Sequence, residues 1–125
     1  MSSAAEEEDY YELLDDKHLF RLAGQVRERW EELLRAGLLQ KEEAGNDPAC
    51  LQESVVEECK KFAPNDNHLQ AHHLLVHWRY KCWQNQCPKR KMLLTLGEAL
   101  KKSGNSEAAQ NFQSDIDTLF SIQYV

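Results

Sequence analysis

Apolar residues recur at intervals of three and four along most of this chain, the spacing that places side chains on one face of an α-helix. The inward positions of a first helix are Leu19, Leu22, Ala23 and Val26. Asp15 or Asp16 is a suitable N-cap for it. A break near Arg27 and Glu28 precedes a second, short helix, which is predicted to end at Gly37. The inward positions of this second helix are Trp30, Leu33, Leu34 and Leu38.

Four further helices follow a polar segment. Residues 40–49 contain the turn cluster Gly45-Asn46-Asp47-Pro48 and are predicted to form a loop. The apolar spacing then indicates helices over 51–62, 69–82 and 91–102, and from 106 toward Ile116. Their inward positions are Leu51, Val55, Cys59 and Phe62, then Ala71, Leu74, Leu75, Trp78 and Cys82, then Leu93, Leu96 and Leu100, and finally Ala109 and Phe112. The pattern predicts an all-α fold, an antiparallel six-helix bundle with a long loop between its second and third helices, over 39–54.

The chain has 125 residues, enough for one domain with its own hydrophobic core. We expect a flexible acidic leader over residues 1–12, the helical bundle over 13–116, and a frayed or helix-extending tail over 117–125. No stretch approaches the roughly 18 consecutive apolar residues of a membrane helix. The acidic N-terminus does not fit a secretory signal peptide, which favours a cytoplasmic location, with the nucleus as the alternative.

The net charge of -6 is divided unevenly along the chain. Residues 1–66 carry 17 acidic and 8 basic side chains, whereas residues 67–125 carry 4 acidic and 7 basic ones. Opposite signs in the two halves suit head-to-tail association, in which an acidic face of one molecule meets a basic face of another. The alternative is that the acidic surface only keeps the protein soluble. A net negative charge argues against nucleic acid as the main ligand.

Four histidines between residues 68 and 77 are candidate metal ligands. His68 with His72, and His73 with His77, are spaced four residues apart, so each pair could bind a metal such as zinc. The two pairs point about 100° apart on a helix. The glutamate of a His-Glu-x-x-His motif is missing. A solvated helix face is therefore the main interpretation, with metal binding as the alternative.

The four cysteines are predicted to be free thiols in a reducing compartment. Cys82 and Cys87 could chelate a metal together with the histidines, but no second cysteine pair lies within reach in the sequence. Cys59 and Cys82 fall on apolar stripes and are expected to be small core residues. We therefore expect no cofactor.

Several segments together carry a resemblance to a known family through their order and spacing. They are Leu22-Ala23, Trp30-Glu31-Glu32-Leu33-Leu34, Gly37-Leu38, His73-Leu74-Leu75-Val76-His77-Trp78, Leu93-Leu94-Thr95-Leu96-Gly97-Glu98-Ala99-Leu100 and Gly104-Asn105-Ser106-Glu107-Ala108-Ala109. Over about residues 16–112 they resemble the death domain family of six-helix interaction domains, in which such tryptophans anchor the core. The long stretch 39–54 and an irregular third helix depart from the family pattern.

Two charged surfaces are the candidates for binding, because the resemblance implies that neighbouring subunits dock asymmetrically through patches on different faces. The basic surface is expected to comprise Arg79, Tyr80, Lys81, Trp83, Lys89, Arg90, Lys91, Lys101 and Lys102. The acidic surface is expected to comprise Glu31, Glu32, Glu42, Glu43, Glu53, Glu57 and Glu58. The expected anchors are Arg79, Tyr80, Trp83 and Arg90, because arginine and aromatic residues are favoured at interface hot spots. The alternative is that both surfaces are only solvated charge.

The resemblance implies a non-enzymatic module that assembles complexes in apoptotic, NF-κB or innate-immune signalling. The chain would be an adaptor, or the cytoplasmic part of a receptor or kinase. Its partner would be another death-domain protein or a second copy, with no nucleic acid, membrane contact or small-molecule substrate. Two other hypotheses are a metal-dependent helical protein and a small DNA-binding domain that uses residues 89–91.

Overall fold

The computed structural model describes residues 13–38 and 48–123, except for the side chains of 48–52 and 119–123. Every regular element within these ranges is helical, which confirms the all-α prediction. The acidic leader expected over 1–12 and the main part of the expected loop, residues 39–47, lie outside the described residues.

The first helix, α2 (Asp16–Val26), begins at an N-cap that the sequence predicts. The carboxylate of Asp15 accepts a hydrogen bond of 2.8 Å from the backbone N–H of His18, which satisfies one of the free donors at the helix start. All four expected inward positions of α2 are buried. The helix ends at Arg27, whose φ of 46° lies in the left-handed region and turns the chain.

A bent segment follows, residues 27–38, made of the 3₁₀ turn η1 (Arg27–Arg29), the single turn α3 (Trp30–Leu33) and the π-helical η2 (Leu34–Leu38). Gly37 lies near its end with a φ of 111°, a conformation that favours glycine because it has no Cβ. The bend keeps four apolar side chains inside: Trp30, Leu33, Leu34 and Leu38. The expected break and the expected end at Gly37 are both confirmed.

The next helix, α5 (Pro48–Phe62), starts three residues earlier than its apolar pattern suggests. Proline is tolerated in the first turn of a helix, where its missing N–H would have no partner. Residues 48–54 of the loop expected over 39–54 are therefore helical. Val55 and Cys59 are buried as expected, but Phe62 is 61% exposed, so its assignment to the core is wrong.

Three further helices complete the described fold: α6 (Asn67–Gln84), α7 (Lys89–Lys102) and α8 (Ser106–Gln123). Asp66 caps α6 by accepting the backbone N–H of Leu69 at 3.0 Å. Gly104 ends the turn after α7 with a φ of 79°, as its position in the sequence predicts. The last helix continues to Gln123, so the segment after Ile116 extends the helix.

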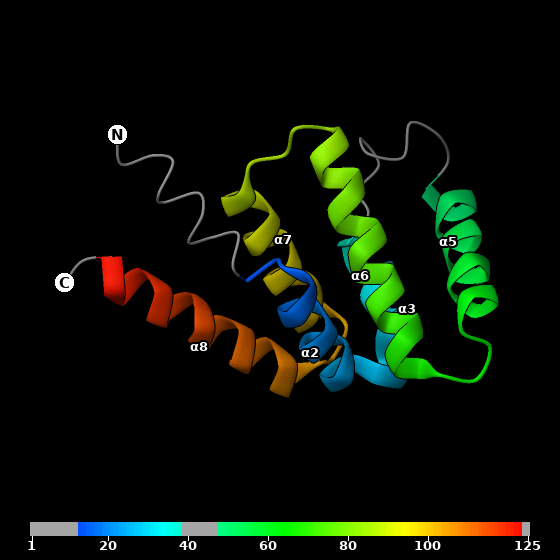
Figure 1. The fold of residues 1–125 in the computed structure, drawn as a ribbon, viewed down its shortest axis with the longest axis horizontal. Helices are drawn as coiled ribbons and strands as arrows, with labels where there is room; N and C mark the ends of the chain where they lie inside the picture. Colours follow the sequence, from blue (N-terminus) through cyan, green and yellow to red (C-terminus); the bar gives the residue numbers. More distant parts are fainter. Residues whose placement is uncertain (1–12, 39–47, 124–125) are drawn as a thin grey trace.

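Figure 1 shows how the helices are arranged around α6. α2 and α5 pack on different faces of α6, and α7 follows it through a short turn. α5 lies at one edge of the molecule and α8 at the opposite edge. None of the helices in the described ranges combines the length and apolar composition that a membrane span requires.

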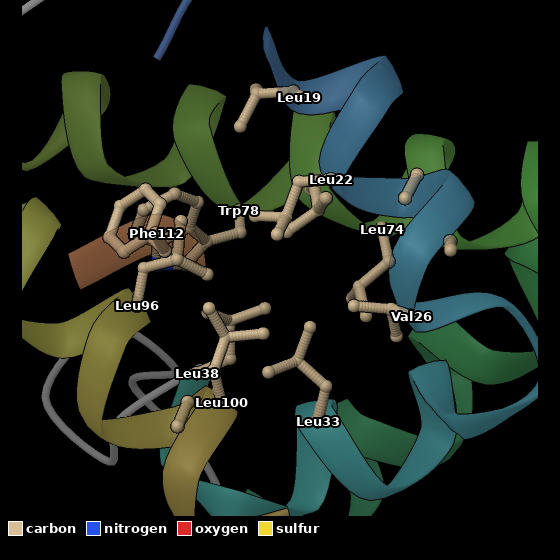
Figure 2. Packing of buried hydrophobic residues seen from close by; sticks show 14 of the residues in the cluster. Leu19, Leu22, Val26, Leu33, Leu38, Leu74, Trp78, Leu96, Leu100 and Phe112 are labelled. Carbon is tan, nitrogen blue, oxygen red and sulfur yellow. The ribbon is translucent and has the colours of Figure 1, made fainter. Parts of the chain in front are cut away.

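The core lies where α2, the bent segment, α6, α7 and α8 converge (Figure 2). Its two largest side chains, Trp30 and Trp78, are almost completely buried, as the sequence predicts. Around them pack residues from all five segments, including Leu19, Leu22, Val26, Leu33, Leu38, Leu74, Leu96, Leu100 and Phe112. Burial of each large apolar side chain contributes about 1.5–3 kcal/mol, so this convergence holds the surface helices in place.

Candidate functional site

A positively charged surface forms where α6 ends and α7 begins. We call it the basic corner and define it as Tyr80, Lys81, Trp83, Lys89, Arg90 and Lys91. Arg90 and Lys91 are exposed, while Lys81 and Lys89 are half-buried. Tyr80 is 55% exposed and Trp83 is 38% exposed. These two aromatic residues are three apart on α6 and therefore share one side of the helix. The corner thus combines cations with two accessible rings.

The turn between the helices brings the two halves of the basic corner together. The backbone N–H of Cys87 donates to the carbonyl of Cys82 at 2.9 Å, which returns the chain to the end of α6. Gln86 makes this possible with a left-handed φ of 54°. Pro88 then precedes α7, and its carbonyl accepts the N–H of Met92 at 3.0 Å. Lys89 follows the turn directly and begins α7, so the cations of α7 come just after the end of α6.

The basic corner has no acidic residue close to it in the sequence, because neither aspartate nor glutamate occurs between Asp66 and Glu98. Residues 67–97, from α6 to the middle of α7, therefore carry cations and no carboxylate of their own. Most protein surfaces mix both signs. This gap in the acidic residues is visible in the sequence and is a sharper signal than the summed charge of the two halves.

Arg79, one of the expected anchors, does not lie on the exposed surface. It is buried, because it lies four residues after Leu75 on the face of α6 that packs against α2. Its Nη1 donates to the carbonyl of Leu14 at 2.8 Å, and its Nη2 forms an ion pair with Asp16. Its guanidinium carbon lies 4.7 Å from the ring centroid of Trp83, within cation–π range. Arg79 thus connects the start of α2 with the ring of Trp83.

Lys101 and Lys102 are exposed at the opposite end of α7 and do not extend the basic corner. Ten residues of helix separate Lys91 from Lys101, a distance of about 15 Å along the axis. Lys102 lines a shallow groove between η2 and α7. The other residues of this groove are Ala36, Gly37, Leu94, Thr95, Glu98 and Ala99. The basic residues therefore form two separate groups.

The expected acidic surface is present in part. Glu32, Glu53 and Glu57 are exposed on α3 and α5, and we call these three residues the acidic face. Glu31 is paired with Lys60 at 2.9 Å and with Arg35 at 3.9 Å, so its charge is largely compensated. Glu42 and Glu43 lie outside the described residues.

Glu58 turns toward α6, where it meets one of the two histidine pairs. Its carboxylate lies 3.6 Å from Nε2 of His73 and 3.8 Å from Nδ1 of His77. Phe62 stacks on the ring of His73 with the ring centroids 4.4 Å apart. This contact explains the exposure of Phe62, because the last residue of α5 packs on the rim of α6 instead of on the core. The pair therefore joins α5 to α6.

The other histidine pair faces α2, as the difference in direction between the pairs predicts. His68 stacks on Phe20 at 4.2 Å, and its Nε2 lies 2.8 Å from the carbonyl of Phe20. His72 contacts the edge of the same ring, with the centroids 5.2 Å apart. The contact made by Phe20 could not be predicted from the apolar spacing, because Phe20 lies off the apolar stripe of α2, whereas Phe62 lies on the predicted stripe of α5 but packs on a histidine of α6.

Burial controls the protonation of two of these histidines. Desolvation lowers the pKa of His77, and the nearby charges of Lys81 and His73 add to the effect while Glu58 opposes it. Desolvation also lowers the pKa of His72, and Asp16 opposes it. Both side chains are therefore held neutral more strongly than free histidine. Among the described residues, no group of three or more histidine, cysteine, aspartate or glutamate side chains is arranged to hold a metal ion.

Cys59 and Cys87 are free thiols in the part of the chain whose side chains the structure describes. Cys59 and Cys82 are buried, as the sequence predicts, and Cys87 is half-buried. Burial raises the pKa of Cys59 to about 12, and the neighbouring carboxylate of Glu58 adds to this effect. A thiol held protonated in this way is a poor nucleophile and a poor metal ligand. Cys59 therefore acts as a small core residue.

No family model matches the chain, and searches of curated proteins and of solved structures find no significant match.

Proposed function

We propose that the protein is a non-enzymatic interaction module that assembles head to tail with domains of the same six-helix kind, in the manner of the death domain family. The order of α2, the bent segment, α5, α6, α7 and α8 supports this proposal. The two buried tryptophans support it as well, because they lie at the positions on which the resemblance depends. The protein would act in the cytoplasm as an adaptor, or as part of a receptor or kinase, in apoptotic, NF-κB or innate-immune signalling.

The observation that carries the proposal is the basic corner, with exposed cations beside Tyr80 and Trp83 and no acidic residue between Asp66 and Glu98. The acidic face of the same molecule offers the complementary charge. Exposed ion pairs contribute only ~0–1 kcal/mol each. The affinity must therefore come largely from the two rings, because aromatic residues at the centre of an interface dominate binding energy. The charges would set the orientation and speed the encounter.

The test compares two variants with the same change in charge. R90E/K91E alters the basic corner, and K101E/K102E alters the opposite end of α7. Complex formation with a second copy, and with a panel of death-domain proteins, is followed by size-exclusion chromatography with light scattering. We expect R90E/K91E to lose binding and K101E/K102E to retain it, with unchanged helical circular dichroism in both. Unaltered assembly of R90E/K91E would contradict the proposal.

A complementary variant tests whether the two surfaces dock on each other. E53K/E57K alters the acidic face and is also expected to abolish assembly. A mixture of R90E/K91E with E53K/E57K retains one intact basic corner and one intact acidic face. Where wild-type copies assemble, this mixture should form a one-to-one dimer that cannot grow further, although each variant alone stays monomeric. A mixture that stays monomeric would show that the two surfaces are not partners.

A further inference from the structure

One carboxylate beside the basic corner comes from the N-terminal part of the chain. Asp16 forms an ion pair with Arg79, and Arg79 in turn lies over the ring of Trp83. Residues 67–97, which include α6 and the first part of α7, contribute no acidic residue of their own. The first residues of α2 therefore already supply negative charge to this side of the molecule.

Residues 1–12 are connected to the fold through Leu13 and Leu14, next to Asp16 and Arg79. Leu13 and Leu14 are buried, and the carbonyl of Leu14 accepts the hydrogen bond of 2.8 Å from Arg79. The distance from Leu14 to Arg90 is roughly 30 Å at most, measured along Arg79, the end of α6 and the turn that follows. Twelve extended residues can span about 40 Å. The N-terminal twelve residues are therefore long enough to reach every residue of the basic corner.

Their composition fits the corner. Residues 1–12 carry five carboxylates and neither lysine nor arginine. The carboxylates are Glu6, Glu7, Glu8, Asp9 and Glu12. The carboxylates of residues 1–12 and the cations of the basic corner attract one another at low ionic strength. In 0.1 M salt this attraction is screened beyond about 10 Å. The attachment at Leu14 gives the segment an effective concentration at the corner of the order of millimolar, so several weak contacts suffice.

We infer that the acidic residues of 1–12 bind the basic corner of their own molecule and compete there with the acidic surface of a partner. The inference rests on the proposed function in taking the corner as the docking surface. The bound segment shields Arg90 and Lys91, and a partner must displace it. Neutralising the segment therefore strengthens partner binding, whereas raising the salt concentration weakens the internal contact.

Zero-length crosslinking of the full chain tests the internal contact without any partner. A water-soluble carbodiimide joins a carboxylate to a lysine amine only when the two groups touch, and mass spectrometry locates the bond. We expect crosslinks from Glu6, Glu7, Glu8 or Asp9 to Lys89 or Lys91, which decrease in 0.5 M salt. Lys101 and Lys102 on the same helix are the matched control and should not be crosslinked to this segment. Equal crosslinking at both ends of α7, or none at Lys89 and Lys91, would overturn the inference.

Mixing unlabelled protein with ¹⁵N-labelled protein separates contacts within one molecule from contacts between copies. The expected crosslinks join peptides with the same label. Crosslinks that join unlabelled to labelled peptides would show that the acidic segment reaches a second copy, and they would overturn the internal contact.

Competition is tested with the variant E6Q/E7Q/E8Q/D9N in the partner assay. We expect this variant to bind the partner several-fold more tightly than the wild type. If the expected crosslinks form but the variant binds the partner no more tightly than the wild type, the acidic segment does not compete with the partner. If no partner binds either protein, the proposed function fails, whereas the crosslinks still decide whether the acidic segment occupies the corner.

Discussion

The indole N–H of Trp30 donates a hydrogen bond of 3.0 Å to the side-chain oxygen of Gln70, forty residues away on α6. The amide nitrogen of Gln70 in turn donates to the carbonyl of Ala63 at 2.7 Å. Gln70 is buried, so this one side chain satisfies two polar groups that water cannot reach. It thereby joins the bent segment, the end of α5 and α6.

We predict that Q70A lowers the free energy of unfolding by about 2–4 kcal/mol, because it leaves the Trp30 donor and the Ala63 acceptor buried without partners. Urea unfolding followed by circular dichroism measures the change. A double-mutant cycle with W30F isolates the bond, and a coupling energy of about 1 kcal/mol is expected. Strictly additive effects of the two substitutions would show that the bond contributes nothing.

The second prediction concerns Arg79. R79M should lower the free energy of unfolding by about 2–3 kcal/mol, because the Leu14 carbonyl loses its charged donor and the contact with Trp83 is lost. D16N is the matched control at the other end of the ion pair. The Asp16 side chain is 74% exposed, so this substitution should cost less than about 1 kcal/mol. An equal decrease in the free energy of unfolding for R79M and D16N would contradict the conclusion that Arg79 stabilises the fold mainly through Leu14 and Trp83.

Stability should fall on acidification below about pH 6.5, the ordinary pKa of histidine. The pKa values of His72 and His77 are lowered in the folded protein, chiefly by burial. The unfolded chain therefore binds more protons than the native state between the lowered pKa values and 6.5. The stabilisation that comes from keeping these two histidines neutral is fully present above that pH range. It is lost as the pH falls through the range. Urea unfolding between pH 7.5 and 5 measures the effect, because the carboxylates remain mostly ionised there.

The variant H77Q supplies the control for this pH dependence. It removes one of the two histidines whose pKa burial lowers, so its loss of stability between pH 7.5 and 5 should be smaller than that of the wild type. The double variant H72Q/H77Q should show a still flatter profile. If the wild-type protein is more stable at pH 5 than at pH 7.5, burial does not keep His72 and His77 neutral in the folded state.

The fourth prediction uses the reactivity of the thiols. Burial raises the pKa of Cys59 to about 12, so iodoacetamide at pH 7.5 should leave Cys59 unmodified in the folded protein. Cys87 is half-buried and should react faster. Mass spectrometry after timed alkylation reports each site, and 8 M urea should make both thiols react at similar rates. Rapid native modification of Cys59 would mean that α5 separates readily from α6.

Much of the fold could be predicted because the relevant interactions are local. Asp15 and Asp66 cap helices through hydrogen bonds to the third residue beyond them, and Gly104 ends a turn through its own backbone angle. The core positions of α2, α6 and α7 follow directly from apolar spacing. Phe62 was misplaced because the last residue of a helix lies where the neighbouring core ends, and the spacing carries no information about that limit.

The candidate surface was harder to predict, because charge in a sequence does not reveal what each cation contacts. Lys91 and Lys101 look equivalent along the chain, yet the length of α7 separates them by about 15 Å. Arg79 looks like its neighbours Tyr80 and Lys81, but its partner Leu14 lies 65 residues away. Helix ends and apolar stripes depend on residues within about four positions, and the amino-acid sequence alone therefore specifies them. The choice between a buried tie and an exposed docking residue depends on which distant segment packs alongside, and only the tertiary structure makes that choice.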